Sequence, residues 1–278
     1  MRRLLITGFV LGCLGIAAPL FAENPQRPIT NPKFDPTAPK IGMFEGIEQE
    51  AIEAKLIPKN SLEGTLLVTN KGTEPITVQI PEGFVGVPVS AQFGTTGGTF
   101  GGTGTGTGNN QGGGQQQAIG GGLGGGGFGG GGGFGGGGFG GGQQGFFSIP
   151  AERTVALKVT SVCLEHGKSE PNPRVAYKVI PTETYTQDAT LQHLIAMVGT
   201  GKLEVGSAQA AAWHIASGMS WNDLARKTYN RVAAPDTPYF APAQLAQAQA
   251  LVAAAEHAAK TATETPATTP TRTSRTAR

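Results

Sequence analysis

The chain has 278 residues, a formal net charge of +2 and 45 glycines. Charged residues make up only 14% of it, and a near-neutral balance gives no long-range attraction to nucleic acid or anionic lipid. Because 31 of the glycines fall in residues 94–145, the length that can bury a core is limited to one β unit and one helical unit.

Residues 1–22 have the pattern of a cleavable secretory signal peptide. Two arginines form the positive start, an apolar run of roughly 18 residues follows, and Ala22 is the small residue expected at the cleavage site. A retained membrane anchor and a lipoprotein that keeps Cys13 are the alternatives. No later segment is long and apolar enough to span a bilayer. We therefore expect a protein of the periplasm, cell envelope or extracellular space.

Removal of this segment changes the chemistry of the mature chain. The only charges it carries are the two arginines, so the mature chain is formally neutral. The mature chain also keeps a single cysteine, Cys163, which excludes an intramolecular disulfide. Its stability must therefore come from packing.

Residues 23–42 carry five prolines and no periodicity, which predicts an extended linker. After a helical turn, alternating apolar and polar residues predict short strands in two blocks, residues 43–93 and 146–185. The clearest alternating runs cover residues 52–56, 66–68, 76–80, 85–89, 155–161 and 175–179. Antiparallel strands with one solvent-exposed face indicate an immunoglobulin-like β-sandwich within an α+β fold, and the two blocks supply the two parts of that sandwich.

Residues 94–145 predict a disordered insertion between two strands of the sandwich. Glycine has no side chain to bury and loses the most entropy on ordering. The stretch carries no charge, and phenylalanines at spacings of five or six residues would serve as weak association points. The candidate interaction residues are Phe128, Phe134 and Phe139. An inert repeat is the alternative, and in either case deletion of residues 94–145 is expected to leave the fold intact.

After residue 185 the apolar period changes to that of a helix, which predicts a helical segment over residues 186–260. We expect helices at 191–198, 207–217 and 242–260, with another helix capped by Ser220. Trp213 and Trp221 are expected to join these helices to each other or to the sandwich, and are candidate interaction residues. Residues 261–278, rich in Thr, Pro and Arg, predict a disordered tail.

Cys163 and His166 form the most reactive-looking pair in the chain. A nucleophilic Cys163 would need a base beside it, and no oxyanion motif accompanies the pair. As zinc ligands the two residues would need further partners such as His193 or His214, and no second paired motif exists. The favoured interpretation is a cysteine buried at the end of a core strand. We expect no catalytic residue, no cofactor and no bound metal.

Several sequence blocks follow one another in a distinctive order. They are FVGVPVSAQ at 84–92 running into the glycines, CLEHGK at 163–168, AQAAAW at 208–213 and GMSW at 218–221. This order resembles a family of secreted bacterial proteins of unknown function. The resemblance implies that the glycine tract lies inside a domain, and it assigns no site.

These patterns favour a non-enzymatic structural or adhesive protein of the envelope or extracellular space, which uses its Gly/Phe-rich arm for weak association. The expected partners are the protein itself or envelope and extracellular polymers or proteins, not nucleic acid. A specific binding module on the helical segment is the first alternative. An enzyme that depends on a cysteine or a metal is the second.

Overall fold

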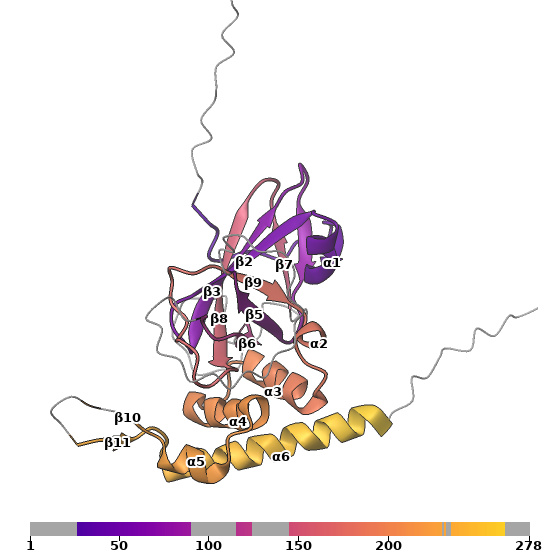
Figure 1. Cartoon of the computed structure of the whole chain (residues 1–278). Helices are drawn as coiled ribbons and strands as arrows, with labels where there is room; N and C mark the ends of the chain where they lie inside the picture. Colours follow the sequence, from indigo (N-terminus) through magenta and orange to yellow (C-terminus); the bar gives the residue numbers. More distant parts are fainter. Residues whose placement is uncertain (1–26, 90–114, 124–144, 230, 232–234, 265–278) are drawn as a thin grey trace, which may run out of the picture.

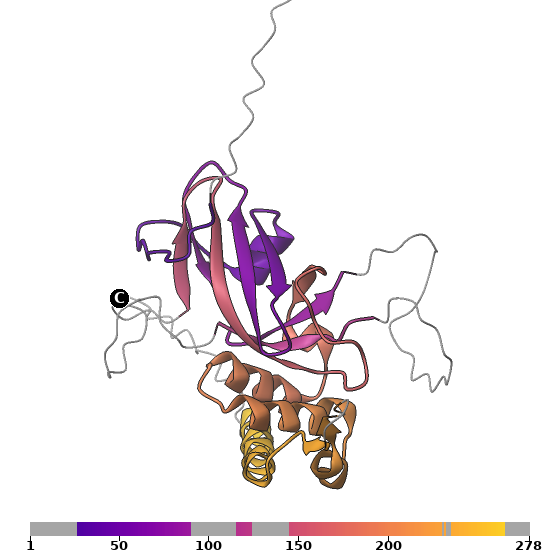
Figure 2. The same ribbon diagram turned by 90° about the vertical axis from the view of Figure 1, so that its left-hand side faces the viewer.

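The computed structural model describes residues 27–89, 115–123, 145–229, 231 and 235–264 (Figure 1). Most of the β-structure forms one end of the molecule and most of the helices form the other (Figures 1 and 2). The predicted signal peptide 1–22 and residues 265–278 of the predicted tail lie outside the described residues. The prediction of a disordered tail over residues 261–278 is wrong for residues 261–264, which form the last turn of a helix. Within the described part of the chain, none of the helices combines the length and the apolar character needed to cross a membrane.

Six strands close into a barrel. Around the barrel they are β2 (Ile52–Pro58), β3 (Glu63–Asn70), β8 (Thr154–Cys163), β6 (Ile119–Gly122), β5 (Phe84–Pro88) and β9 (Tyr177–Ile180), each antiparallel to its neighbours. The predicted α+β class is confirmed, but the strands form a closed barrel and not the two facing sheets of an immunoglobulin-like sandwich. In a sandwich and in a barrel alike, alternating apolar and polar residues place the apolar face of each strand in the core. The alternation does not indicate which strands pair with each other.

A second sheet lies beside the barrel. It contains β1 (Lys40–Gly42), β4 (Ile76–Gln79) and β7 (Phe146–Ile149), with β1 parallel and β7 antiparallel to the central β4. Helix α1 (Met43–Glu48) follows β1 directly and packs on β2. The parallel pair makes the β-structure mixed, whereas the alternating runs indicated antiparallel strands throughout.

The described part of the predicted linker is held against the β-structure. The Ile29 N–H donates to the Thr154 carbonyl and the Ala156 N–H donates to the Ile29 carbonyl, at 2.8 and 2.9 Å. Residues 40–42 form strand β1. The prediction of an extended linker over residues 23–42 is therefore wrong for these positions, because the non-proline residues between the prolines still pair with neighbouring strands.

Part of the glycine tract is a barrel strand. Residues 119–122 pair with β5 on one side and β8 on the other, and all four are buried. A Cβ on Gly121 would lie 2.0 Å from the carbonyl oxygen of Thr160, so a side chain there would collide with the backbone of β8. The prediction of a disordered insertion over residues 94–145 is wrong for residues 115–123 and for Gly145, whose carbonyl accepts from the Ile80 N–H at 2.8 Å. The remaining residues of 94–144 lie outside the described residues.

The helical residues pack in layers under one end of the barrel. Helices α3 (Ala189–Gly199) and α4 (Val205–Ser217) contact the barrel strands, and α6 (Pro242–Glu264) packs against both helices from below (Figures 1 and 2). The shorter elements are α2 (Thr182–Tyr185), α5 (Trp221–Arg226), β10 (Thr228–Tyr229) and β11 (Thr237–Pro238). Barrel and helices share one hydrophobic core, so the predicted boundary at residue 186 does not separate two cores.

The helix ends follow from local sequence. Ser220 caps α5 by accepting a hydrogen bond from the Asp223 N–H at 3.1 Å, as predicted. Glu204 caps α4 in the same way through the N–H groups of Gly206 and Ser207. Gly218 ends α4 with a φ of 67°, the left-handed conformation that glycine adopts most readily.

Candidate functional site

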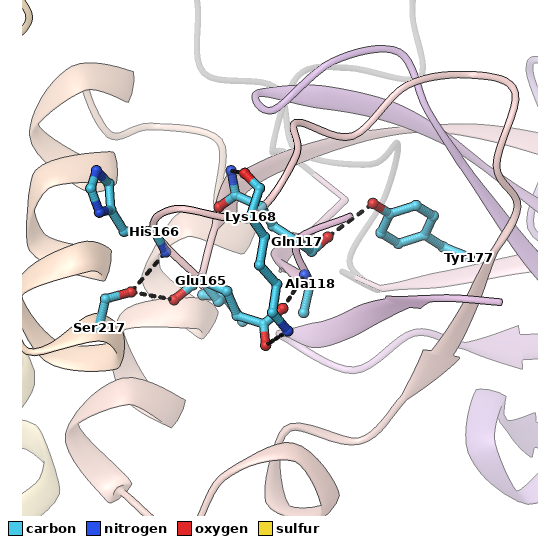
Figure 3. Close-up of polar contacts among 8 residues, drawn as sticks. Gln117, Ala118, Glu165, His166, Lys168, Tyr177 and Ser217 are labelled. Carbon is cyan, nitrogen blue, oxygen red and sulfur yellow. Dashed lines mark hydrogen bonds and ion pairs between the residues drawn. The ribbon is translucent and has the colours of Figure 1, made fainter. Parts of the chain in front are cut away.

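The loop after β8, residues 164–168, is tied to helix α4. The Cys163 N–H donates to Gln209 Oε1 and Gln209 Nε2 donates to the Cys163 carbonyl, both at 2.8 Å. The Ser217 hydroxyl donates to the Leu164 carbonyl and accepts from the His166 N–H, both at 2.9 Å (Figure 3). Helix α4 therefore sets the position of the loop at two points.

The other side of this loop is tied to the residues that lead into β6. Glu165 Oε2 accepts from the Ala118 N–H at 2.9 Å, and the Lys168 ammonium pairs with the same carboxylate (Figure 3). The Tyr177 hydroxyl donates to the Gln117 carbonyl at 2.9 Å. The loop is thus held between the barrel and the helices, and it presents His166 at the junction of the two.

Cys163 is buried, with a relative exposure of 1%. Burial raises the pKa of its thiol to about 12, and the charges of Glu170 and Glu165 add to this effect. The thiolate is the nucleophilic form of cysteine, so Cys163 is in the wrong protonation state for catalysis near neutral pH. Its place at the end of β8 matches the expected buried core cysteine.

The burial of Cys163 predicts its reactivity. We expect the native protein to react with an aromatic disulfide thiol reagent at least about 100-fold more slowly than the same protein in denaturant, because both access and the thiolate fraction are suppressed. Release of the coloured thiol measures both rates. Fast reaction of the native protein, at a rate near that of the denatured chain, would show that Cys163 is accessible.

The His166 ring contacts Lys227 and Trp213, which leaves it without the role of a base for Cys163. Its Nε2 lies 3.1 Å from the Lys227 ammonium, and its ring meets the Trp213 ring edge-on at a centroid distance of 4.8 Å. Partial burial lowers the pKa of His166, and the charge of Lys227 lowers it further. A neutral imidazole is therefore the acceptor for the Lys227 ammonium.

The possible metal ligands do not gather. Among residues 27–89, 115–123, 145–229, 231 and 235–264, no three His, Cys, Asp or Glu side chains lie together in a metal-binding arrangement. His214, one of the further partners considered for a zinc site, has Nδ1 at 2.7 Å from the Met219 carbonyl and stacks on Trp221 at 4.1 Å. Its side chain is engaged in packing the start of α5.

An aromatic cluster surrounds Lys227. We give this name to Trp213, Tyr229, Tyr239, Phe240 and Lys227. The Lys227 ammonium lies 5.3 Å from the centroid of the Trp213 ring and 4.9 Å from that of the Tyr239 ring, and both distances are typical of a cation–π contact. Tyr229 stacks on Tyr239 at 4.4 Å.

The candidate interaction residues have different outcomes. Trp213 is 5% exposed and belongs to the shared core, whereas Trp221 is partly exposed. The sequence interpretation missed Lys227, Tyr229 and Tyr239. Two tyrosines ten residues apart across a Pro-Asp turn were the available signal for the β10–β11 hairpin. The other candidates, Phe128, Phe134 and Phe139, lie outside the described residues.

A shallow groove of about 420 Å³ lies between the N-terminal residues and the second sheet. Its lining residues are Ile29, Asn31, Pro32, Lys33, Asp35, Pro75, Ser148 and Pro150. The Asp35 carboxylate already accepts from the N–H and the hydroxyl of Thr37, at 2.9 and 2.6 Å. The one carboxylate in this lining is therefore already engaged within its own turn.

Comparison with known proteins found no matching family model, curated protein or solved structure. The resemblance to a family of secreted bacterial proteins stays a prediction.

Proposed function

We propose that this chain is a secreted, non-enzymatic structural or adhesive protein that uses Gly/Phe-rich residues for weak association. The proposal rests on the positions at which the strands on either side of the Gly-rich segments end and begin. β5 ends at Pro88 and β6 begins at Ile119, then β6 ends at Gly122 and β7 begins at Phe146. Each Gly-rich segment, 90–114 and 124–144, is therefore attached at both ends to one folded body, and neither connects separate domains.

The composition of these two segments supports association in place of folding. They carry no charge and have few apolar side chains, so they offer little surface to bury in a core. A single phenylalanine contact is weak, but several contacts on one body act together through a high effective concentration. The apolar run of residues 1–22 supports an extracytoplasmic setting for such contacts.

A phenylalanine-to-serine variant tests this proposal. Replacing Phe128, Phe134 and Phe139 together with serine is expected to reduce self-association and envelope retention several-fold, because it removes the apolar contact points and keeps the segment length. Analytical ultracentrifugation and cell fractionation measure the two effects. The melting temperature should not change, since the three positions lie outside the barrel strands.

The matched control replaces three threonines of the other segment, Thr103, Thr105 and Thr107, with serine. This triple change should leave sedimentation and fractionation as in the wild type. If the phenylalanine variant sediments and fractionates like this control, the adhesive arm is the wrong explanation. Deletion of residues 94–145 is unsuitable as a test, and the expectation that it leaves the fold intact is wrong, because it removes strand β6.

A binding module on the helical segment is the second candidate function. It is favoured by the aromatic cluster, in which Tyr229 is exposed on a hairpin that packs over a buried tryptophan. Partly rigid, exposed aromatic side chains are common at binding surfaces.

A further inference from the structure

Lys227 carries a positive charge that no carboxylate balances within the described residues. The ion pairs found there join Lys59 to Glu63, Lys71 to Glu53, Lys168 to Glu165 and Arg226 to Asp223. Lys227 instead contacts two aromatic rings and the His166 imidazole. These contacts hold its ammonium in a fixed place without neutralising it, so the surface around it favours an anionic partner.

Tyr229 provides a flat surface in the same cluster, because it stacks on the Tyr239 ring that Lys227 also contacts. Tyr229 is 48% exposed, although its ring stacks on Tyr239 with an interplanar angle of 24°. Tyr229 also pairs with Thr237 in the β10–β11 hairpin. A ring that is fixed before binding loses little conformational entropy when a partner packs on it.

Trp213 adds an unsatisfied donor to the same cluster. The ring beneath Lys227 is buried, and its indole N–H has no acceptor among the described residues. Buried donors without an acceptor are rare in folded proteins. That donor is out of reach of solvent, so the groups that the cluster presents are a fixed cation and an exposed ring, which together suit a ligand that carries both a negative charge and an apolar face.

We propose that Lys227 and Tyr229 bind a polysaccharide that carries carboxylate groups. The carboxylate would pair with the Lys227 ammonium, and the C–H face of a sugar ring would pack on Tyr229. Burial raises the pKa of the Tyr239 phenol, and Tyr229 and then the charge of Glu170 add to this effect, so a carboxylate near the cluster opposes an anion and keeps the affinity of each site modest. A repeating polymer compensates for modest affinity through many equivalent sugars.

This inference rests on the proposed extracytoplasmic setting, where such polymers occur, but it involves residues apart from the Gly-rich segments. The test is affinity electrophoresis of the full chain in gels that contain polygalacturonate or its methyl-esterified form. The two polymers share a backbone and differ in charge. We expect retardation by polygalacturonate with an apparent affinity at least about tenfold above that for the ester, and a further loss as salt increases.

Variants assign the effect to the two residues. Lys227→Gln and Tyr229→Ala should each weaken binding about tenfold, whereas Lys227→Arg, which keeps the charge, should retain most of it. Lys59→Gln is the matched control, because Lys59 is an exposed lysine in the turn between β2 and β3, outside the aromatic cluster, and it should bind as the wild type does. Tryptophan fluorescence and the melting temperature check that each variant is folded.

The proposal would be overturned by no retardation by polygalacturonate, by equal retardation by the ester, or by unchanged binding of folded Lys227→Gln and Tyr229→Ala. The triple phenylalanine variant separates this result from the proposed adhesive function. If that variant loses self-association but still binds polygalacturonate, the two activities reside in different parts of the chain. Loss of polygalacturonate binding in the triple variant would assign the polymer contact to the Gly/Phe-rich residues and remove it from Lys227.

Discussion

Replacing Gly121 with alanine is expected to lower the free energy of unfolding by about 3 kcal/mol, the upper end of the usual cost of overpacking a core. The new Cβ would lie 2.0 Å from the Thr160 carbonyl oxygen and 2.8 Å from the Ser161 Cα. Both atoms belong to the backbone of β8, which is paired on its other side with β3, so neither can move without breaking the barrel. Urea denaturation followed by circular dichroism measures the change.

Gly42→Ala is the matched control for this experiment. A Cβ at Gly42 would be no closer than 3.7 Å to its neighbours, and the residue has a φ of −68°, which alanine adopts readily. We expect its free energy of unfolding to stay within about 0.5 kcal/mol of the wild-type value, as for most substitutions that disturb no packing. Equal stability of Gly121→Ala and Gly42→Ala would mean that residues 119–122 are not a strand between β5 and β8.

The helices were predicted well because their signals are local. The apolar spacing of residues 191–198 lies within α3, and Ser220 caps α5 through its own third residue. Such signals need only neighbours within one or two helical turns. The same is true of the alternating runs that became β2, β3 and β8.

The pairing of the strands could not be predicted from such local signals. β9 closes the barrel by pairing with both β2 and β5, which lie more than about 85 residues before it in the chain. The period-2 pattern of each strand is the same in a barrel as in a sandwich, so the closed arrangement depends on contacts that the pattern does not encode.

Strand β6 was missed for a related reason. Its three consecutive glycines look like those of the surrounding tract, and their strand conformation is imposed by β5 and β8. Two neighbours carried a signal, since Ala118 and Ile119 are apolar and both are buried. The aromatic cluster was missed because Lys227 and Tyr239 meet Trp213 only after α5 and the hairpin fold back over α4.

The second large effect is expected at Gln209, where leucine should lower the free energy of unfolding by about 3 kcal/mol. The Gln209 side chain satisfies both the N–H and the carbonyl of Cys163 at 2.8 Å, in a buried position. Leucine has a similar size but leaves two buried backbone groups without partners, and each costs about 1–3 kcal/mol. Chemical denaturation measures the loss.

The reactivity of Cys163 distinguishes loss of the Gln209–Cys163 hydrogen bonds from a general loss of stability. Because Gln209 joins α4 to the end of β8, its loss should let the two separate in the native state and speed the reaction of Cys163 with a thiol reagent under native conditions. Gln209→Glu should be at least as unstable as Gln209→Leu at neutral pH, because its carboxylate would be a buried charge facing the Cys163 carbonyl, to which it cannot donate. Gln249→Leu, an exposed change on α6, is the control for added hydrophobicity. If Gln209→Leu unfolds and reacts as this control does, α4 is held on the barrel by its apolar contacts alone.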